Sequence, residues 1–122
     1  MGQRGFTLVE LSVIIGLIGL LALAALPPLA AFRERIYLET ASQQLLTDLR
    51  RTQAEALCAG TDRAYDSASL PLPGGLACNA KQFKFAGSGE PPPGGSGTVL
   101  IAGRTGRGRS VIVSSAGRIR LE

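Results

Sequence analysis

The most apolar part of the chain is an uninterrupted run from Leu11 to Phe32. It contains no charged residue, and Ser12 is its only strongly polar side chain. At about 1.5 Å per helical residue, a run of this length crosses a hydrocarbon core of roughly 30 Å, so the pattern predicts a membrane-spanning helix. Glu10 stands directly before the run. A carboxylate at the bilayer centre costs roughly 2.5–3.5 kcal/mol, and less toward the interface, so its position needs a reason.

A different periodicity follows Phe32. Apolar or small side chains recur at helical spacing between residues 33 and 59, and polar side chains occupy the opposite face. This pattern predicts the second half of one long helix, which ends near Gly60 and packs its apolar stripe on a sheet. The stripe consists of Tyr37, Leu38, Ala41, Leu45, Leu46, Leu49, Ala56 and Leu57.

Short segments rich in β-branched or aromatic residues predict strands in the C-terminal half. In contrast, residues 61–79 hold several Pro and Gly residues and are expected to be irregular, and GSGEPPPGGSG is expected to form a surface loop. The expected fold is α+β, with a long N-terminal helix packed on a small antiparallel β-domain. The expected strands are Gln82–Phe85, Val99–Ala102, Ser110–Ser114 and Arg118–Leu121, with a turn at Ala116-Gly117.

Two consecutive prolines, Pro27 and Pro28, lie near the end of the apolar run. Proline removes a backbone donor from a helix and its ring clashes with the preceding turn. We therefore expect a kink or local melting, and a sharp break, where the chain leaves the membrane.

Composition and charge reduce the number of function classes that this chain could belong to. The 122 residues include 13 Lys and Arg, 9 Asp and Glu and no His, for a formal net charge of +4. Without His, a close carboxylate pair or a phosphate-binding loop, we expect no enzyme activity, no cofactor and no metal site. All of the excess positive charge lies after Asn79, where seven basic residues face two acidic ones, and this indicates an anionic partner such as nucleic acid or lipid headgroups.

The only two cysteines, Cys58 and Cys78, flank the irregular segment. If this domain is exported, a disulfide between them is the expected state, and it would contribute on the order of 3 kcal/mol. The alternative is a pair of unrelated buried thiols.

Three interpretations of the N-terminal segment compete. An ordinary secretory signal has an apolar stretch of only about 7–15 residues, and a plain membrane anchor leaves Glu10 unexplained. The third interpretation accounts for the glutamate. The stretch Gly5-Phe6-Thr7-Leu8-Val9-Glu10 closely resembles the type III signal of type IV pilins and type II secretion pseudopilins.

The resemblance implies specific processing and assembly. A prepilin peptidase would cut after Gly5 and methylate Phe6, leaving the leader, residues 1–5, in the cytoplasm; Arg4 agrees with the positive-inside tendency. In a filament, Glu10 would pair with the N-terminal amine of a neighbouring subunit, so that two costly buried charges satisfy each other. The partners implied are other pilins or pseudopilins, the peptidase and an inner-membrane assembly platform.

The same resemblance implies where each part of the chain resides. Residues 6–32 would span the bacterial inner membrane once, with the N-terminus cytoplasmic, and would later form the filament core. Residues 33–122 would form the periplasmic or extracellular domain, first at the membrane and then in a periplasmic or cell-surface filament.

The C-terminal part resembles the GspH/FimT subgroup of minor pilins and pseudopilins through LLTDLRRTQAEA, FKF, GGSGTVLI and RSVIVSSAGRIRLE. Some FimT-like minor pilins bind DNA during natural transformation through a C-terminal Gly-Arg-x-Arg motif, which Gly117, Arg118 and Arg120 match. On a strand, two such arginines point to the same face about 6.6–6.8 Å apart and could hold successive phosphates. A second arginine cluster precedes the motif, and together with Arg118 and Arg120 it would set the possible DNA footprint: Arg104, Arg107 and Arg109.

These arginines also have plainer interpretations. They could keep an edge strand soluble, with Arg120 paired to Glu122 or Glu90, or they could meet another anionic partner. The expected function is a minor pilin or pseudopilin that contributes to sequence-independent binding of double-stranded DNA and to its uptake. The alternatives are a GspH-like pseudopilin of a type II secretion system without a DNA role, and a fibre-forming major pilin.

Overall fold

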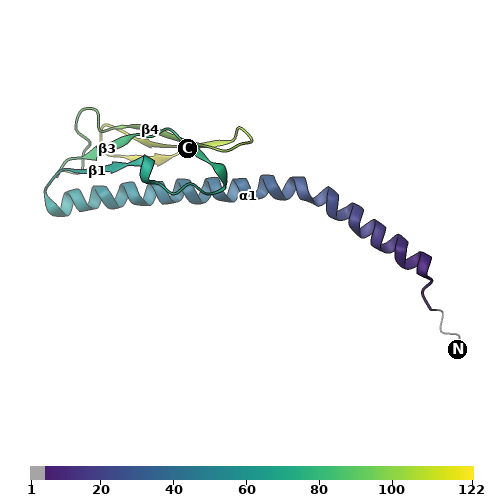
Figure 1. Cartoon of the computed structure of the whole chain (residues 1–122). Coiled ribbons are helices and arrows are strands. Elements are labelled where there is room, and N and C mark those ends of the chain that lie inside the picture. The colour runs from purple at the N-terminus through teal and green to yellow at the C-terminus, as the bar shows by residue number, and fades with distance from the viewer. Residues whose placement is uncertain (1–4) are drawn as a thin grey trace. The chain divides into compact units, whose positions relative to one another are not determined.

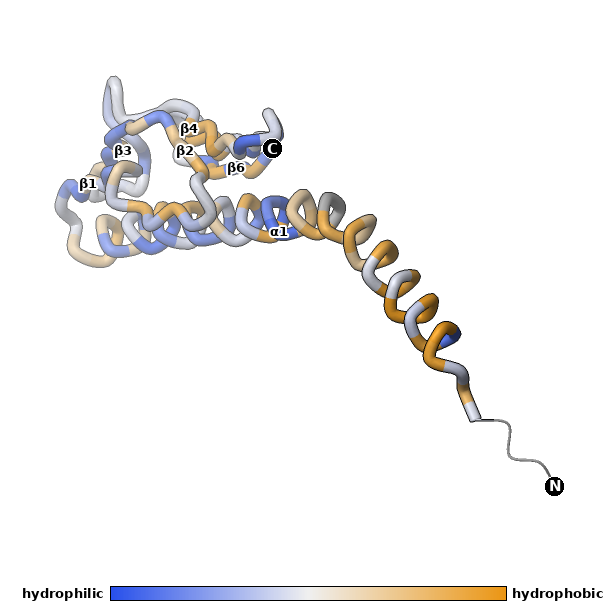
Figure 2. The backbone as a smooth tube through the Cα atoms, turned by 45° about the vertical axis from the view of Figure 1, so that its right-hand side comes forward, coloured by the Kyte–Doolittle hydropathy of each residue, from blue (hydrophilic) through white to orange (hydrophobic). Residues whose placement is uncertain are grey.

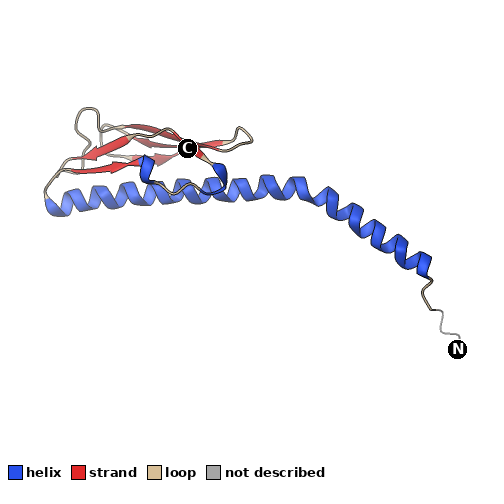
Figure 3. Ribbon diagram, viewed as in Figure 1, coloured by secondary structure: helices blue, strands red, loops and turns tan. Residues whose placement is uncertain are grey.

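The computed structural model describes residues 5–122, with the side chains at positions 27 and 28 excepted. One long helix, α1 (Leu8–Ala59), is followed by short strands and two 3-10 turns (Figure 1, Figure 3). The chain forms two compact units, residues 1–33 and 34–122, and α1 contributes residues to both. The strands are β1 (Arg63–Asp66), β2 (Ala77–Cys78), β3 (Gln82–Phe85), β4 (Gly97–Ala102), β5 (Gly108–Val113) and β6 (Ile119–Leu121).

The first unit consists of the apolar half of α1. Its large apolar side chains are exposed, and none of its most apolar stretch is buried among the described residues. Figure 2 shows the high hydropathy of this half of the helix as mostly orange. Among the described residues, α1 is the one helix long and apolar enough to cross a membrane. An apolar helix whose side chains find no partner in its own chain is consistent with membrane anchoring.

The helix continues without interruption through Pro27 and Pro28. The expected sharp break and local melting are therefore not found. A proline deletes only its own hydrogen bond to the carbonyl four residues earlier, so the backbone on both sides retains helical dihedral angles when the remaining bonds hold. The expected kink stays a prediction.

The second unit packs the amphipathic half of α1 against two antiparallel sheets. One has two strands, in the order β1-β3, and the other has four, in the order β2-β4-β5-β6. Alternate residues of each strand face the helix, as the burial of Val99 and Ile101 in β4 and of Val111 and Val113 in β5 shows. The core joins the helix stripe to the strands through Leu38, Ala41, Leu45, Leu49, Ala56, Phe83, Phe85, Val99, Ile101, Val111 and Val113.

This arrangement confirms the α+β fold predicted from the sequence. The helix ends at Ala59, followed by Gly60 with a φ of 62°. All four predicted strands are present, with bounds that differ by at most two residues. Within the predicted stripe, Leu57 lies outside the core with 52% of its surface exposed, whereas the preceding residue, Ala56, is fully buried.

The prediction of an irregular segment over residues 61–79 is partly wrong. Strand β1 pairs with β3 from Arg63↔Phe85 to Asp66↔Gln82, and β2 pairs with β4 through two residues. Both strands are too short for a sequence pattern to reveal, and pairing with a longer partner stabilises them. Between them, Leu70 and Leu76 are buried in the core, which fixes the path of this Pro- and Gly-rich segment.

Candidate assembly and anion-binding sites

The predicted processing site lies in the non-helical segment before α1. Gly5 and Phe6 are exposed, and 72% of the Phe6 surface is accessible. An exposed, non-helical peptide bond is the form that a protease binds. The rest of the predicted leader, residues 1–4 with Arg4, lies outside the described residues.

Glu10 occupies the first turn of α1. The Thr7 hydroxyl accepts a hydrogen bond from the Glu10 backbone N–H over 3.3 Å, so Thr7 caps the helix. An acidic side chain in the first turn is also favoured by the helix dipole. The Glu10 carboxylate is exposed and makes no ion pair with a described residue. Helix capping therefore explains why the helix starts here, and the carboxylate remains available to a partner.

The hairpin that joins β5 and β6 carries the Gly-Arg-x-Arg motif. Its turn is closed by hydrogen bonds from the Gly117 N–H to the Ser114 carbonyl (3.0 Å) and from the Ser114 N–H to the Arg118 carbonyl (2.9 Å). Gly117 has a φ of 74°, the left-handed conformation that this turn requires. The motif glycine thus has a structural role that does not depend on any ligand.

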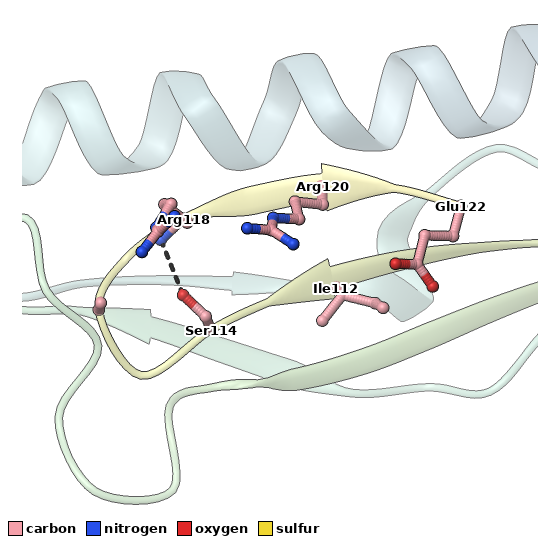
Figure 4. A pocket seen from close by; sticks show the side chains of 6 residues that line it. Ile112, Ser114, Arg118, Arg120 and Glu122 are labelled. Carbon is pink, nitrogen blue, oxygen red and sulfur yellow. Dashed lines mark hydrogen bonds between the residues drawn. The ribbon is translucent and has the colours of Figure 1, made fainter.

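Arg118 and Arg120 lie on the sheet face away from α1. Arg120 stands opposite Ile112 in the ladder, and directly opposed residues share a face. Both arginines line a shallow hollow of about 300 Å³ together with Ile112 and Glu122 (Figure 4). Neither makes an ion pair with a described residue, so the expected pairing of Arg120 with Glu122 or Glu90 is not found.

The hairpin between β4 and β5 is built on the same turn. The Gly103 N–H donates to the Arg107 carbonyl (2.7 Å), the Gly106 N–H donates to the Gly103 carbonyl (3.3 Å), and Gly106 has a φ of 78°. The sequence that follows, Gly106-Arg107-Gly108-Arg109, is a second Gly-Arg-x-Arg pattern. The chain therefore holds two copies of one motif in equivalent positions of adjacent hairpins, which the sequence analysis did not recognise.

Two carboxylates from α1 hold this hairpin. Glu34 Oε1 accepts hydrogen bonds from the Thr105 N–H (3.1 Å) and the Thr105 hydroxyl (2.9 Å). Glu39 Oε2 forms an ion pair with Arg109 Nη2 at 2.8 Å. Sequence reasoning missed both glutamates, because a charged residue beside the apolar stripe does not reveal which distant loop or strand it will contact.

The predicted arginine cluster is consequently divided. Arg109 lies two residues before the buried Val111 on the same strand, so both side chains are on the sheet face toward α1. Arg120 lies on the opposite face. Arg107 is exposed, and the Arg104 guanidinium lies against Gly75, where an added Cβ would stand 2.7–2.9 Å from it. The structure thus brings Arg118 and Arg120 together and separates them from Arg109.

The predicted disulfide is not formed in this structure. Cys58 is exposed on the last turn of α1, whereas Cys78 is half-buried in β2 and packs against the core. The Cys78 thiol donates a weak hydrogen bond to the Ser67 carbonyl over 3.8 Å. The two thiols lie in different environments, and their positions on either side of the segment are not sufficient to predict a disulfide.

Two further side chains, Gln53 and Tyr65, form hydrogen bonds that join α1 to the β-strands and loops. The Gln53 amide donates to the carbonyls of Gly89 (2.7 Å) and Gly117 (3.0 Å), and so joins two loops to the helix. The Tyr65 hydroxyl donates to Asp48 over 3.2 Å. Burial, and then the negative charge and hydrogen bond of Asp48, raise the pKa of Tyr65 to about 12. These contacts help to fix the position of α1 relative to β1 and the two loops.

The N-terminal segment matches the family model of the prokaryotic N-terminal methylation motif over residues 1–26. Neither the curated proteins nor the solved structures gave a match. The motif supports a type IV pilin-like or pseudopilin component, and it implies processing by a prepilin peptidase and assembly with other pilins. Together with the apolar half of α1, it is consistent with membrane anchoring before assembly.

Proposed function

We propose that this protein is a minor pilin or pseudopilin of the GspH/FimT type, inserted through residues 6–32 first into the inner membrane and then into a type IV pilus-like filament. The observation that supports this most strongly is the methylation motif, which is joined to an apolar half-helix whose large side chains are exposed among the described residues. Such a helix becomes stable only in lipid or among other helices. The protein has no enzymatic role in this proposal.

Processing tests the proposal directly. Mass spectrometry of the membrane-extracted protein from its own host should show a chain that begins at methylated Phe6. Retention of residues 1–5, or a mature N-terminus near Phe32 as an ordinary signal peptide would leave, would contradict it.

Assembly tests the role of Glu10. We expect Glu10→Gln to abolish or slow incorporation into filaments while the second unit remains folded, because a neutral amide removes the charge that a neighbouring amine would meet. Ser12→Ala is the matched control, since the Ser12 hydroxyl bonds only to the Leu8 carbonyl of its own helix, at 2.9 Å. Equal filament yields from both variants would contradict the assigned role of Glu10.

We further propose that the β5–β6 hairpin contributes to DNA binding and uptake by holding phosphates of double-stranded DNA. Support comes from Arg118 and Arg120, which share one exposed face and have no ion-pair partner among the described residues. Guanidinium groups bind phosphate with two parallel hydrogen bonds, so each arginine can hold one phosphate. Contacts of this kind read no base sequence.

Salt dependence tests the DNA proposal. With two phosphates contacted, log K for duplex DNA should fall with log salt at a slope of about −1.8, and the affinity should be independent of sequence. Arg118→Gln with Arg120→Gln should bring the slope close to zero. The matched control is Arg107→Gln with Arg109→Gln, which removes the same charge from the other copy of the motif. If both double variants lose binding equally, the effect is one of net charge and the site assignment is wrong.

A further inference from the structure

The β4–β5 hairpin contacts Glu34, the first residue of the second unit. Glu34, which binds Thr105 through two hydrogen bonds, comes two residues after Phe32. Two helical residues correspond to a rise of only about 3 Å. The hairpin is therefore held at the end of the second unit from which the chain connects to the apolar run.

The hairpin and the adjacent helix turn form a cationic hollow of about 260 Å³. It is lined by three arginines, Arg35, Arg107 and Arg109, with Glu39 as the one acidic residue and the buried Leu38 as an apolar contact. Glu39 is already engaged by Arg109, so it does not neutralise Arg35 or Arg107. Those two arginines are exposed and make no ion pair with a described residue.

A bilayer supplies the matching charge at this level. Lipid phosphates form a layer just outside the hydrocarbon core, and each Arg or Lys near an anionic bilayer surface contributes about a fivefold preference for it. Long cationic side chains also extend from a helix end toward that layer. The covalent link to a membrane-spanning helix keeps the local phosphate concentration high, so that weak contacts suffice.

We propose that the hollow formed by Arg35, Arg107 and Arg109 binds the headgroups of anionic phospholipids and docks the β4–β5 hairpin on the membrane before assembly. The β4–β5 copy of the Gly-Arg-x-Arg pattern then faces lipid phosphates. The inference rests on membrane anchoring by the apolar run and is independent of the DNA proposal.

Hydrogen exchange of the full chain in lipid nanodiscs tests this inference. With phosphatidylcholine mixed with phosphatidylglycerol, the backbone amides of residues 103–109 should exchange more slowly than with phosphatidylcholine alone. Arg35→Gln with Arg107→Gln should reduce this lipid-dependent protection by up to about 25-fold, from two factors of five. Arg118→Gln with Arg120→Gln is the matched control and should leave it unchanged.

Three results would overturn the inference. The first is equal exchange of residues 103–109 in the two lipids. The second is equal loss of protection in both double variants, which would reflect net charge alone. The third is protection of residues 103–109 by duplex DNA added to phosphatidylcholine nanodiscs, which would assign this hairpin to nucleic acid. A chain that fails to insert into nanodiscs would contradict the anchoring on which the inference rests.

Discussion

The two hairpins of the four-stranded sheet share a turn and a motif but differ in what surrounds their arginines. In β4–β5, Glu39 from α1 binds Arg109 and Glu34 binds the loop. In β5–β6, no carboxylate among the described residues pairs with Arg118 or Arg120, and the loop is held instead by the neutral amide of Gln53. A four-residue motif therefore does not define a binding site. The charges that the fold brings beside it decide whether its arginines can meet a ligand.

The glycines of the two turns should differ most in their sensitivity to substitution. Both have a left-handed φ, but a Cβ at Gly117 would stand 2.8 Å from the Gly89 carbonyl oxygen, whereas nothing lies within 4 Å of one at Gly106. We expect Gly117→Ala to lower the free energy of unfolding by about 3 kcal/mol and Gly106→Ala by about 1 kcal/mol. Hydrogen exchange of the Val111 and Val113 amides measures both, and equal losses would show that crowding at Gly117 is unimportant.

Loss of the Gln53 contacts should have the next largest effect. Gln53→Ala removes two hydrogen bonds and leaves the carbonyls of Gly89 and Gly117 without this donor, which should cost about 1–2 kcal/mol. Faster exchange is expected around Gly117, with the β4–β5 turn unaffected. Thr47→Ala is the control, because the exposed Thr47 hydroxyl donates to the Gln43 carbonyl of its own helix, at 2.8 Å. A similar response to both substitutions would contradict the assigned role of Gln53.

Removal of the Glu34 carboxylate should loosen the other hairpin alone. Glu34→Ala deletes both acceptor contacts to Thr105, and because the site is partly exposed we expect a cost of about 1 kcal/mol. Exchange of the Thr105 and Gly106 amides should become faster while the Gly117 amide is unchanged. Unaltered exchange at Thr105 would show that the loop holds its shape without the helix.

The ion pair between Arg109 and Glu39 should matter least for stability. Its side chains are 41% and 46% exposed, so solvent screens the attraction and Arg109→Gln should cost at most about 0.5 kcal/mol, and less in high salt. Arg118→Gln, which removes no such pair, should be neutral within the same range. Urea unfolding followed through the Val111 amide would measure both, and a salt-independent loss above about 1 kcal/mol would contradict this ranking.

Local sequence patterns predicted most of the fold. The apolar run and the amphipathic stripe determine α1, because a helix needs only contacts three or four residues apart. Strand β1 could not be predicted, since its four residues depend on pairing with β3. The cysteines illustrate the same limit, because spacing along the chain does not give the direction in which Cys58 and Cys78 point.

The candidate sites also differ in whether they depend on local sequence or on contacts between distant residues. The N-terminal motif with Glu10 is contiguous, so the sequence alone revealed it. Glu34 and Thr105 are 71 residues apart, and Gln53 and Gly117 are 64 apart. Contacts at such separations depend on the tertiary fold, and for this reason the sequence placed all five arginines in one footprint that the structure divides.

The long helix also sets an order of events during synthesis. Residues 34–59 leave the ribosome before the strands that cover their stripe, and the partners of Leu45 and Leu49 include β4 and β5, at residues 97–113. The stripe therefore lacks its strand partners until about 50 further residues have been added, which takes several seconds at typical elongation rates. The charged residues on the polar face of α1 favour solubility of the nascent helix during that interval. This face therefore serves the folding of the chain during synthesis, while the apolar stripe serves packing in the folded domain.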